Sequence, residues 1–146
     1  MATIHEIVEA CQQGTSPLTV ARMRSGWAVM GETQITPGYC LLLPDPVVSS
    51  LNDLKGDARA DFMKDMARLG DAILASTDAW RINYEILGNV EPVLHAHIIP
   101  RYSDEDEPLV RQPVWLHNWE KAPKFDVGLH GELRAQIVHH LKNLPQ

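Results

Sequence analysis

Apolar side chains recur at helical spacing in three stretches of the chain. In the longest stretch, about residues 58–76, they stack at intervals of three and four as Phe62, Met66, Leu69 and Ile73. This spacing places them on one face, which predicts an amphipathic helix that begins after an Asp57 N-cap and packs on a sheet. We expect Met63 in the core as well, and the charged residues of this helix, including Asp65, in solvent.

Two shorter stretches with the same spacing lie near the ends of the chain. Residues 4–13 follow Thr3, which forms a capping-box pattern with Glu6, and they stop before Gly14. Residues 128–144 carry apolar side chains at helical intervals as Leu133, Ile137, Leu141 and Leu144. We therefore predict an N-terminal and a C-terminal helix.

Between the helices, shorter apolar or alternating runs predict five strands, at about residues 18–23, 27–30, 39–43, 80–86 and 94–99. Short turns join neighbouring runs, and Pro37-Gly38 suits the centre of a type II turn. Near-adjacent strands favour hairpins over a parallel unit. The predicted fold is α+β, with a mainly antiparallel sheet, a packed central helix and terminal helices, in one domain over residues 1–146.

Composition narrows the classes of protein that this chain can belong to. The 13 Lys and Arg residues are scattered and the net charge is −6, which argues against a nucleic-acid partner. We find no apolar run of about 20 residues and no basic start followed by an apolar stretch, so we expect neither a membrane span nor a signal peptide. Cys11 and Cys40 have apolar neighbours, so we expect buried free thiols and a cytoplasmic setting.

Residues 81–101 hold the densest group of side chains that could do chemistry. His95 and His97 are two residues apart in a predicted strand that Pro100 is expected to close, so both imidazoles project from one face. Three interpretations stay open: a metal site, a nucleophilic histidine beside a hydrogen-bonding one, or a packed pair without function. A zinc site needs three or four protein ligands, and we see no recognisable spacing that completes one.

The sequence Leu-His-Ala-His-Ile-Ile-Pro-Arg, residues 94–101, resembles the end of the histidine-triad (HIT) signature, His-φ-His-φ-His-φ-φ. His95 falls on the middle histidine and His97 on the last, while Val93 replaces the first. Three further segments resemble the early strands and the pocket of the family: residues 26–29, residues 36–44, and Asn83 with Gly88-Asn89. The resemblance covers roughly residues 15–102.

This resemblance implies a homodimeric nucleotide hydrolase or nucleotidyl transferase that acts on a dinucleoside polyphosphate or another adenylyl compound. It implies that His95 attacks phosphorus to form a nucleotidyl-histidine while a backbone carbonyl near Val93 holds its other nitrogen, with no metal and no cofactor. The remaining substrate-binding residues would be His97, Asn89, Asn83 and Arg101. A nucleotide-binding protein without turnover and a His-x-His metal-binding protein are the alternatives.

Besides Val93, two further positions depart from the family pattern. An acidic or amide residue that often grips the ribose is Gly31 here, and a histidine that often follows Pro-Gly is Tyr39. Ribose and base contacts are therefore not carried over. After the last predicted strand, we expect the acidic residues 103–108 to form a solvated loop, and Trp115 and Trp119 to cover an edge of the core or a partner chain.

Overall fold

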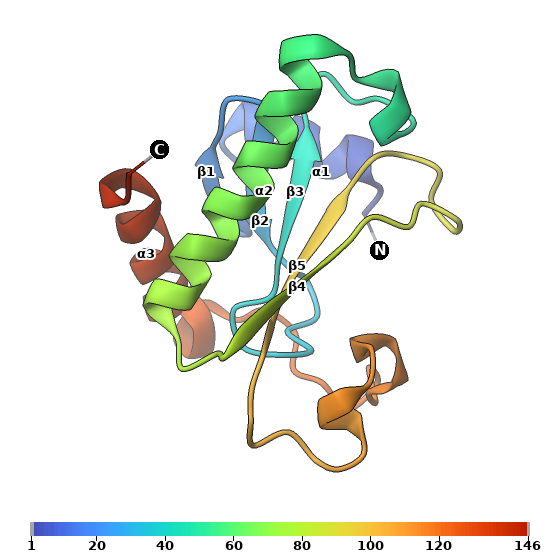
Figure 1. Ribbon diagram of the computed structural model, residues 1–146. Helices are drawn as coiled ribbons and strands as arrows, with labels where there is room; N and C mark the ends of the chain where they lie inside the picture. Colours follow the sequence, from blue (N-terminus) through green and yellow to red (C-terminus); the bar gives the residue numbers. More distant parts are fainter. Residues whose placement is uncertain (1, 146) are drawn as a thin grey trace.

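A computed structural model describes residues 2–145 of the chain. The strands form one five-stranded sheet in the order β1-β2-β3-β5-β4, in which every neighbouring pair is antiparallel (Figure 1). The strands are β1 (Thr19–Arg22), β2 (Gly26–Met30), β3 (Cys40–Pro44), β4 (Arg81–Glu85) and β5 (Ala96–Arg101). The α+β class and the antiparallel sheet are confirmed.

Strand β5 continues past Pro100, which was expected to close it. Pro100 lies opposite Ile82 of β4. Pairing with β3 has already stopped at Cys40 and Ile98, so the missing N–H of Pro100 removes no bond from that ladder.

The long helix α2 (Gly56–Ser76) and the last helix α3 (Val127–Asn143) cover one face of the sheet (Figure 1). The predicted stripe of α2 is buried there: Phe62, Met66, Leu69 and Ile73. Two expectations were wrong. Met63 lies off the stripe and is 46% exposed, and the N-cap is Lys55, which places Asp57 inside the first turn.

Asp65 of α2 is buried, contrary to the prediction that it lies in solvent. Its carboxylate accepts hydrogen bonds from the backbone N–H of Ser25, at 2.8 Å, and from the Ser25 hydroxyl, at 2.6 Å. Charge-assisted bonds of this kind compensate the loss of hydration. They tie the turn between β1 and β2 to α2.

Helix α1 (Ile4–Gln13) packs on the opposite face of the sheet, where Val8 and Cys11 contact Val29 and Leu43. The predicted caps are confirmed. The Thr3 hydroxyl and the Glu6 carboxylate form a capping box, and Gly14 has a φ of 71° at the C-terminal end.

The segment after β5 completes this second face with two 3-10 turns, Leu109–Arg111 and Val114–Leu116. Val114 packs against Tyr39 and Ile99. The expected solvated loop is wrong for Glu105, because its side chain is only 10% exposed and its carboxylate pairs with the buried Arg101 guanidinium at 2.8 Å. A further 3-10 turn, Leu51–Asp53, precedes α2.

The two cysteines, Cys11 and Cys40, are free and buried as expected. Within residues 2–145, none of the helices combines the length and the apolar character needed to cross a membrane.

Candidate functional site

His95 and His97 lie side by side where the chain enters β5. His95 immediately precedes the strand, and His97 lies within it, opposite Leu41 of β3 and Glu85 of β4. The centroids of the two imidazole rings are 4.9 Å apart and the rings meet edge to face, at 71°. The alternation of the strand therefore brings both rings to one face, as predicted.

The half-buried His95 has its ring orientation fixed by the backbone. Its Nδ1 lies 2.6 Å from the carbonyl oxygen of Val93. A carbonyl oxygen only accepts hydrogen bonds, so Nδ1 carries the proton of the neutral ring and Nε2 carries the lone pair. This tautomer is the one that a nucleophilic imidazole requires.

His97 is more deeply placed, with 9% of its surface exposed. Its Nδ1 lies 2.7 Å from the hydroxyl of Tyr39, the residue that follows the Pro37-Gly38 turn. Burial, and secondarily the neighbouring His95, lower the pKa of His97 to about 4. His97 is therefore a neutral hydrogen-bonding group at pH 7.

An aromatic wall, formed by Trp115, Trp119 and Tyr39, encloses the His97 side of the site. The Trp115 ring meets His97 edge to face, with centroids 4.9 Å apart, and stacks on Trp119 at 5.2 Å. Trp119 in turn meets Tyr39 at 6.1 Å, and the Trp115 indole N–H donates to the Glu85 carboxylate. The sequence predicted that the tryptophans cover the core or a partner, but it contained no signal that they reach His97.

Arg101 and Asn83 bind each other instead of pointing freely toward a ligand. The Arg101 guanidinium is buried and donates to Asn83 Oδ1 at 2.9 Å, to the Leu109 carbonyl at 2.9 Å and to the Glu105 carboxylate. His97 and Asn83 share a face of the sheet, since their partners on the neighbouring strand are Glu85 and Ile99. Arg101 and Asn83 therefore brace each other in this structure, and a role for either in substrate binding stays a prediction.

Asn89 lies in the loop between β4 and β5, next to Gly88, whose φ is 76°. The Asn89 side chain is exposed, and the structure does not bring it into a hydrogen bond with either histidine. A role for Asn89 in substrate binding stays a prediction.

The model of the HIT domain family matches residues 27–104, more than half of the chain. The chain belongs to this family. The match includes both histidines, β2 to β5 and α2, and it places the chain in a superfamily of nucleotide-binding hydrolases and transferases. No curated protein matches the chain significantly.

Solved HIT structures share the fold. A histidine triad protein from Bradyrhizobium japonicum is 22% identical, with a TM-score of 0.74 over 89% of this chain and 94% of that one. A hypothetical histidine triad nucleotide-binding protein from Sulfolobus tokodaii is 16% identical, with a TM-score of 0.73 over 94% and 91%. A zinc-bound histidine triad family protein from Mycobacterium smegmatis is 16% identical, with a TM-score of 0.61 over 92% and 91%.

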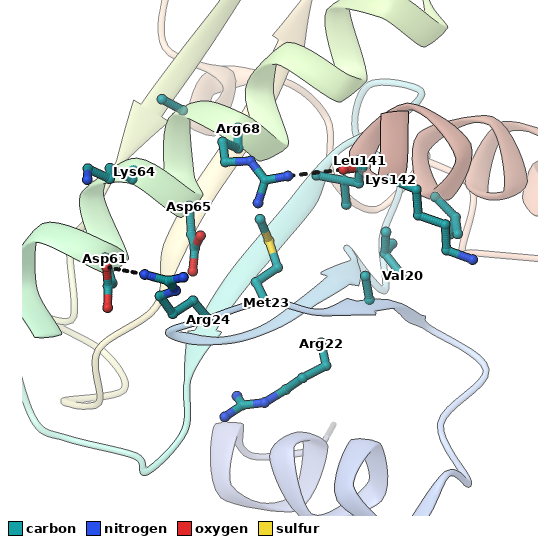
Figure 2. A pocket seen from close by; sticks show the side chains of 13 residues that line it. Val20, Arg22, Met23, Arg24, Asp61, Lys64, Asp65, Arg68, Leu141 and Lys142 are labelled. Carbon is teal, nitrogen blue, oxygen red and sulfur yellow. Dashed lines mark hydrogen bonds and ion pairs between the residues drawn. The ribbon is translucent and has the colours of Figure 1, made fainter. Parts of the chain in front are cut away.

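One cavity of this HIT-family chain lies away from the histidines. It measures about 850 Å³ and is lined by residues of β1, α2 and α3 (Figure 2). Arg24 faces Asp61 there at 4.0 Å, and Arg68 donates to the Leu141 carbonyl. A second cavity, of about 430 Å³, is lined by Asn83, Arg101 and the segment 110–113. Neither cavity is lined by His95 or His97, but the second is also lined by Glu85, which lies opposite His97.

Metal ligation has little support in the geometry. Within residues 2–145, no three side chains of His, Cys, Asp or Glu converge as a metal site requires. Each of the two histidines already uses its Nδ1, toward Val93 and Tyr39. Two imidazole nitrogens without a third ligand do not make a stable zinc site.

Proposed function

We propose that the protein is a nucleotide hydrolase or nucleotidyl transferase that acts on a dinucleoside polyphosphate or another adenylyl compound through a nucleotidyl-His95 intermediate. The observation that carries the proposal is the 2.6 Å hydrogen bond from His95 Nδ1 to the Val93 carbonyl. It leaves the Nε2 lone pair available for attack. The replacement of the first triad histidine by Val93 does not remove this acceptor, because the acceptor is backbone.

In the proposed reaction, His95 Nε2 attacks the phosphorus of the nucleotidyl group. The N–P bond forms as the bond to the leaving phosphate or amine breaks, and the leaving group departs with the electron pair, an amine taking up a proton from water as it leaves. The positive charge on the nucleotidyl-imidazole is stabilised by the Nδ1–H bond to Val93. Water, or an acceptor hydroxyl in a transfer, then attacks the phosphorus and loses its proton to solvent, and the N–P electrons return to Nε2.

His97 supplies a neutral donor to a non-bridging phosphate oxygen in this scheme. Its ring lies 4.9 Å from that of His95, and its pKa of about 4 keeps it neutral at pH 7. A preorganised donor stabilises the charge that develops in the transition state, and removing one such donor lowers the rate about 10²–10³-fold.

The test is to incubate the protein with a panel of adenylyl compounds and to measure mononucleotide release. We expect His95→Ala to reduce turnover to background while nucleotide binding persists, and His97→Ala to reduce it about 10²–10³-fold. In His95→Gly, added imidazole should partly restore the attack. If no compound is turned over but nucleotides bind, the protein is a binding protein without turnover.

Metal binding is a second candidate, favoured by the zinc that the Mycobacterium smegmatis relative carries. The Nε2 atoms of His95 and His97 would supply two of the ligands, which for His97 requires the ring proton to lie on Nδ1, and the remaining ligands would have to come from water or another chain. Metal analysis of the purified protein, with His95→Ala as the control, separates this function from the first. Bound stoichiometric zinc that disappears in the variant would favour it.

We also propose a homodimer, and a cytoplasmic location consistent with the two free thiols. Strand β4 is an edge strand of the sheet, and its outer backbone groups are unpaired within the described chain. Tyr84 lies in this strand and is 42% exposed, and Trp80, which immediately precedes the strand, is 56% exposed. Pairing of β4 with its copy in a second chain would satisfy the edge and cover both aromatic rings.

A further inference from the structure

We propose that Tyr39 is a positioning residue of this site: its hydroxyl holds His97 as an Nε2–H donor, and Gly31 provides the space for its ring. The catalytic consequence rests on the function proposed above. The orientation of the hydrogen bond does not, and it can be measured on the free protein.

The direction of the Tyr39–His97 hydrogen bond follows from the groups around it. The hydroxyl oxygen and Nδ1 are 2.7 Å apart, and among residues 2–145 the Tyr39 hydroxyl has no other hydrogen-bond partner. If Nδ1–H donated, the Tyr39 O–H would stay buried without an acceptor, which is costly. If the hydroxyl donates, its proton is satisfied and Nδ1 of the neutral ring is the acceptor.

Both groups stay in the protonation state that this arrangement needs. Burial raises the pKa of Tyr39 well above its usual value, with Cys40 and Glu85 as smaller causes, so the hydroxyl keeps its proton. The titratable groups beside His97 are His95 on its own strand, Tyr39 from the β3 side and Glu85 on β4. The Glu85 carboxylate is already engaged by the Trp115 indole.

His97 Nε2 is then the single donor of the ring. Within the described chain it has no protein partner, and it is not among the buried polar atoms that lack one, so it reaches solvent. The ring of His95, with its free Nε2, lies 4.9 Å away. The donor therefore lies beside the proposed nucleophile, where a phosphate oxygen would need it.

The Tyr39 ring takes this place because Gly31 has no side chain. A Cβ added at Gly31 would lie 2.3 Å from Tyr39 Cδ2 and 2.4 Å from Cε2, closer than atoms can approach. The buried Gln34 side chain fixes both residues, since its amide N–H groups donate to the Gly31 carbonyl at 2.8 Å and to the Tyr39 carbonyl at 2.9 Å. Gly31 and Tyr39, two of the departures from the family pattern, are thus a matched pair.

The direct test is ¹⁵N NMR of the histidine rings at neutral pH, with His97 assigned from the signals lost in His97→Gln. We expect wild-type His97 in the Nε2–H tautomer, with an Nδ1 shift typical of a hydrogen-bonded acceptor. In Tyr39→Phe, which keeps the ring on Gly31, the Nδ1 shift should move to that of an unbonded nitrogen. A wild-type Nδ1–H tautomer, or an unchanged Nδ1 shift in Tyr39→Phe, would overturn the proposal.

Two further variants test whether the change at His97 is specific to the loss of its hydrogen bond with Tyr39. Tyr102→Phe removes a hydroxyl that donates to the Pro37 carbonyl in the same turn, and it should leave His97 unchanged. Gly31→Ala keeps the Tyr39 hydroxyl but displaces the ring, and it should alter the Nδ1 shift as Tyr39→Phe does. If Gly31→Ala does not fold, Tyr39→Phe alone decides, because it adds no atom to the core.

In turnover of an adenylyl compound, Tyr39→Phe should lower kcat about 10-fold, the effect of one neutral hydrogen bond, with a smaller change in KM. Added to His97→Ala, the same substitution should have no further effect, because Tyr39 acts through His97. If the NMR result holds and no compound is turned over, the proposed function fails and the positioning role stands. If turnover occurs and the Nδ1 shift is unchanged in Tyr39→Phe, the positioning role fails and the proposed function stands.

Discussion

The charge of His97 depends strongly on the surroundings of its ring. Its pKa is about 4 in the folded chain, because burial disfavours the charged ring, and about 6.5 in an unfolded chain. The unfolded state therefore binds the proton first as pH falls. The stability that His97 contributes is complete above about pH 6.5, and it is lost as the pH falls toward 4.

We predict that protonation of His97 lowers the free energy of unfolding by on the order of 3 kcal/mol across that pH interval, at about 1.4 kcal/mol per pKa unit. Urea unfolding between pH 7.5 and pH 4 should show a steeper loss for the wild type than for His97→Gln. Burial raises the pKa of Glu105, but its hydrogen bonds, led by that with Arg101, lower the pKa overall. Protonation of Glu105 in acid therefore destabilises the wild type and His97→Gln equally, and this loss cancels when the two proteins are compared. Equal pH dependence of the two proteins would contradict the buried neutral state of His97.

The periodicity of the chain was sufficient to identify residues that share a face. The two-residue spacing placed His95 beside His97, and the family resemblance pointed to a carbonyl near Val93 as the acceptor. The sequence pattern could not identify Tyr39 as the partner of His97, because 58 positions separate the two residues. Nor could it show that the Arg101 guanidinium pairs with Glu105, because a run of acidic residues gave no reason to place Glu105 in the interior.

At the scale of single elements, α2 is held on the sheet by one apolar stripe. Met66 lies in this stripe and is 7% exposed, whereas Met63, three residues earlier in the same helix, is 46% exposed. Met66→Ala should lower the unfolding free energy by about 2–5 kcal/mol, since it removes buried atoms and leaves a cavity. Met63→Ala is the matched control and should stay within about 0.5 kcal/mol. Similar values for both in denaturant melts would contradict this placement of the helix.

The segment after β5 is anchored by the buried ion pair between Arg101 and Glu105, to which His117 adds a hydrogen bond at 2.8 Å. Glu105→Ala leaves the Arg101 charge buried without its carboxylate, so we expect a loss of about 3–5 kcal/mol. It should also loosen Trp115, which tryptophan fluorescence and acrylamide quenching would detect.

The control for Glu105 is Glu107, which forms an exposed pair with Arg111 at 2.9 Å, with 61% and 73% of the two side chains exposed. Glu107→Ala should change stability by less than about 1 kcal/mol, because water screens such pairs. If Glu105→Ala were as mild as Glu107→Ala, the ion pair would not anchor the aromatic wall.

The same limit of sequence reasoning applies to Asp65. Charged residues on helices normally face water, and the partner that buries Asp65 is Ser25, 40 residues earlier in the chain. Spacing within a helix identifies the face that is apolar, but it carries no information about a distant turn that supplies two donors to a carboxylate. Element types and the antiparallel sheet were therefore predictable, whereas the long-range polar contacts were not.

At the scale of the whole molecule, the proposed homodimer predicts a mass twice that of the 16.4 kDa chain in sedimentation equilibrium. Tyr84→Lys places a charge on the edge strand β4, which opposes pairing between sheet edges, and it should yield the monomer. Leu129→Lys, at a residue 73% exposed on α3, is the control and should keep the dimer mass. A wild-type protein that sediments as a monomer at all concentrations would exclude the dimer.

The central claim is that His95 carries the nucleotidyl group during turnover. The most direct measurement is rapid quenching of the wild type in alkali during reaction with an adenylyl substrate, followed by intact mass and peptide mass spectrometry under alkaline conditions, in which a phosphoramidate survives. The account predicts a mass increase of one adenylyl group on the peptide that contains His95, absent from His95→Ala and from protein without substrate. Turnover without any adduct, or an adduct on another residue that persists in His95→Ala, would contradict it.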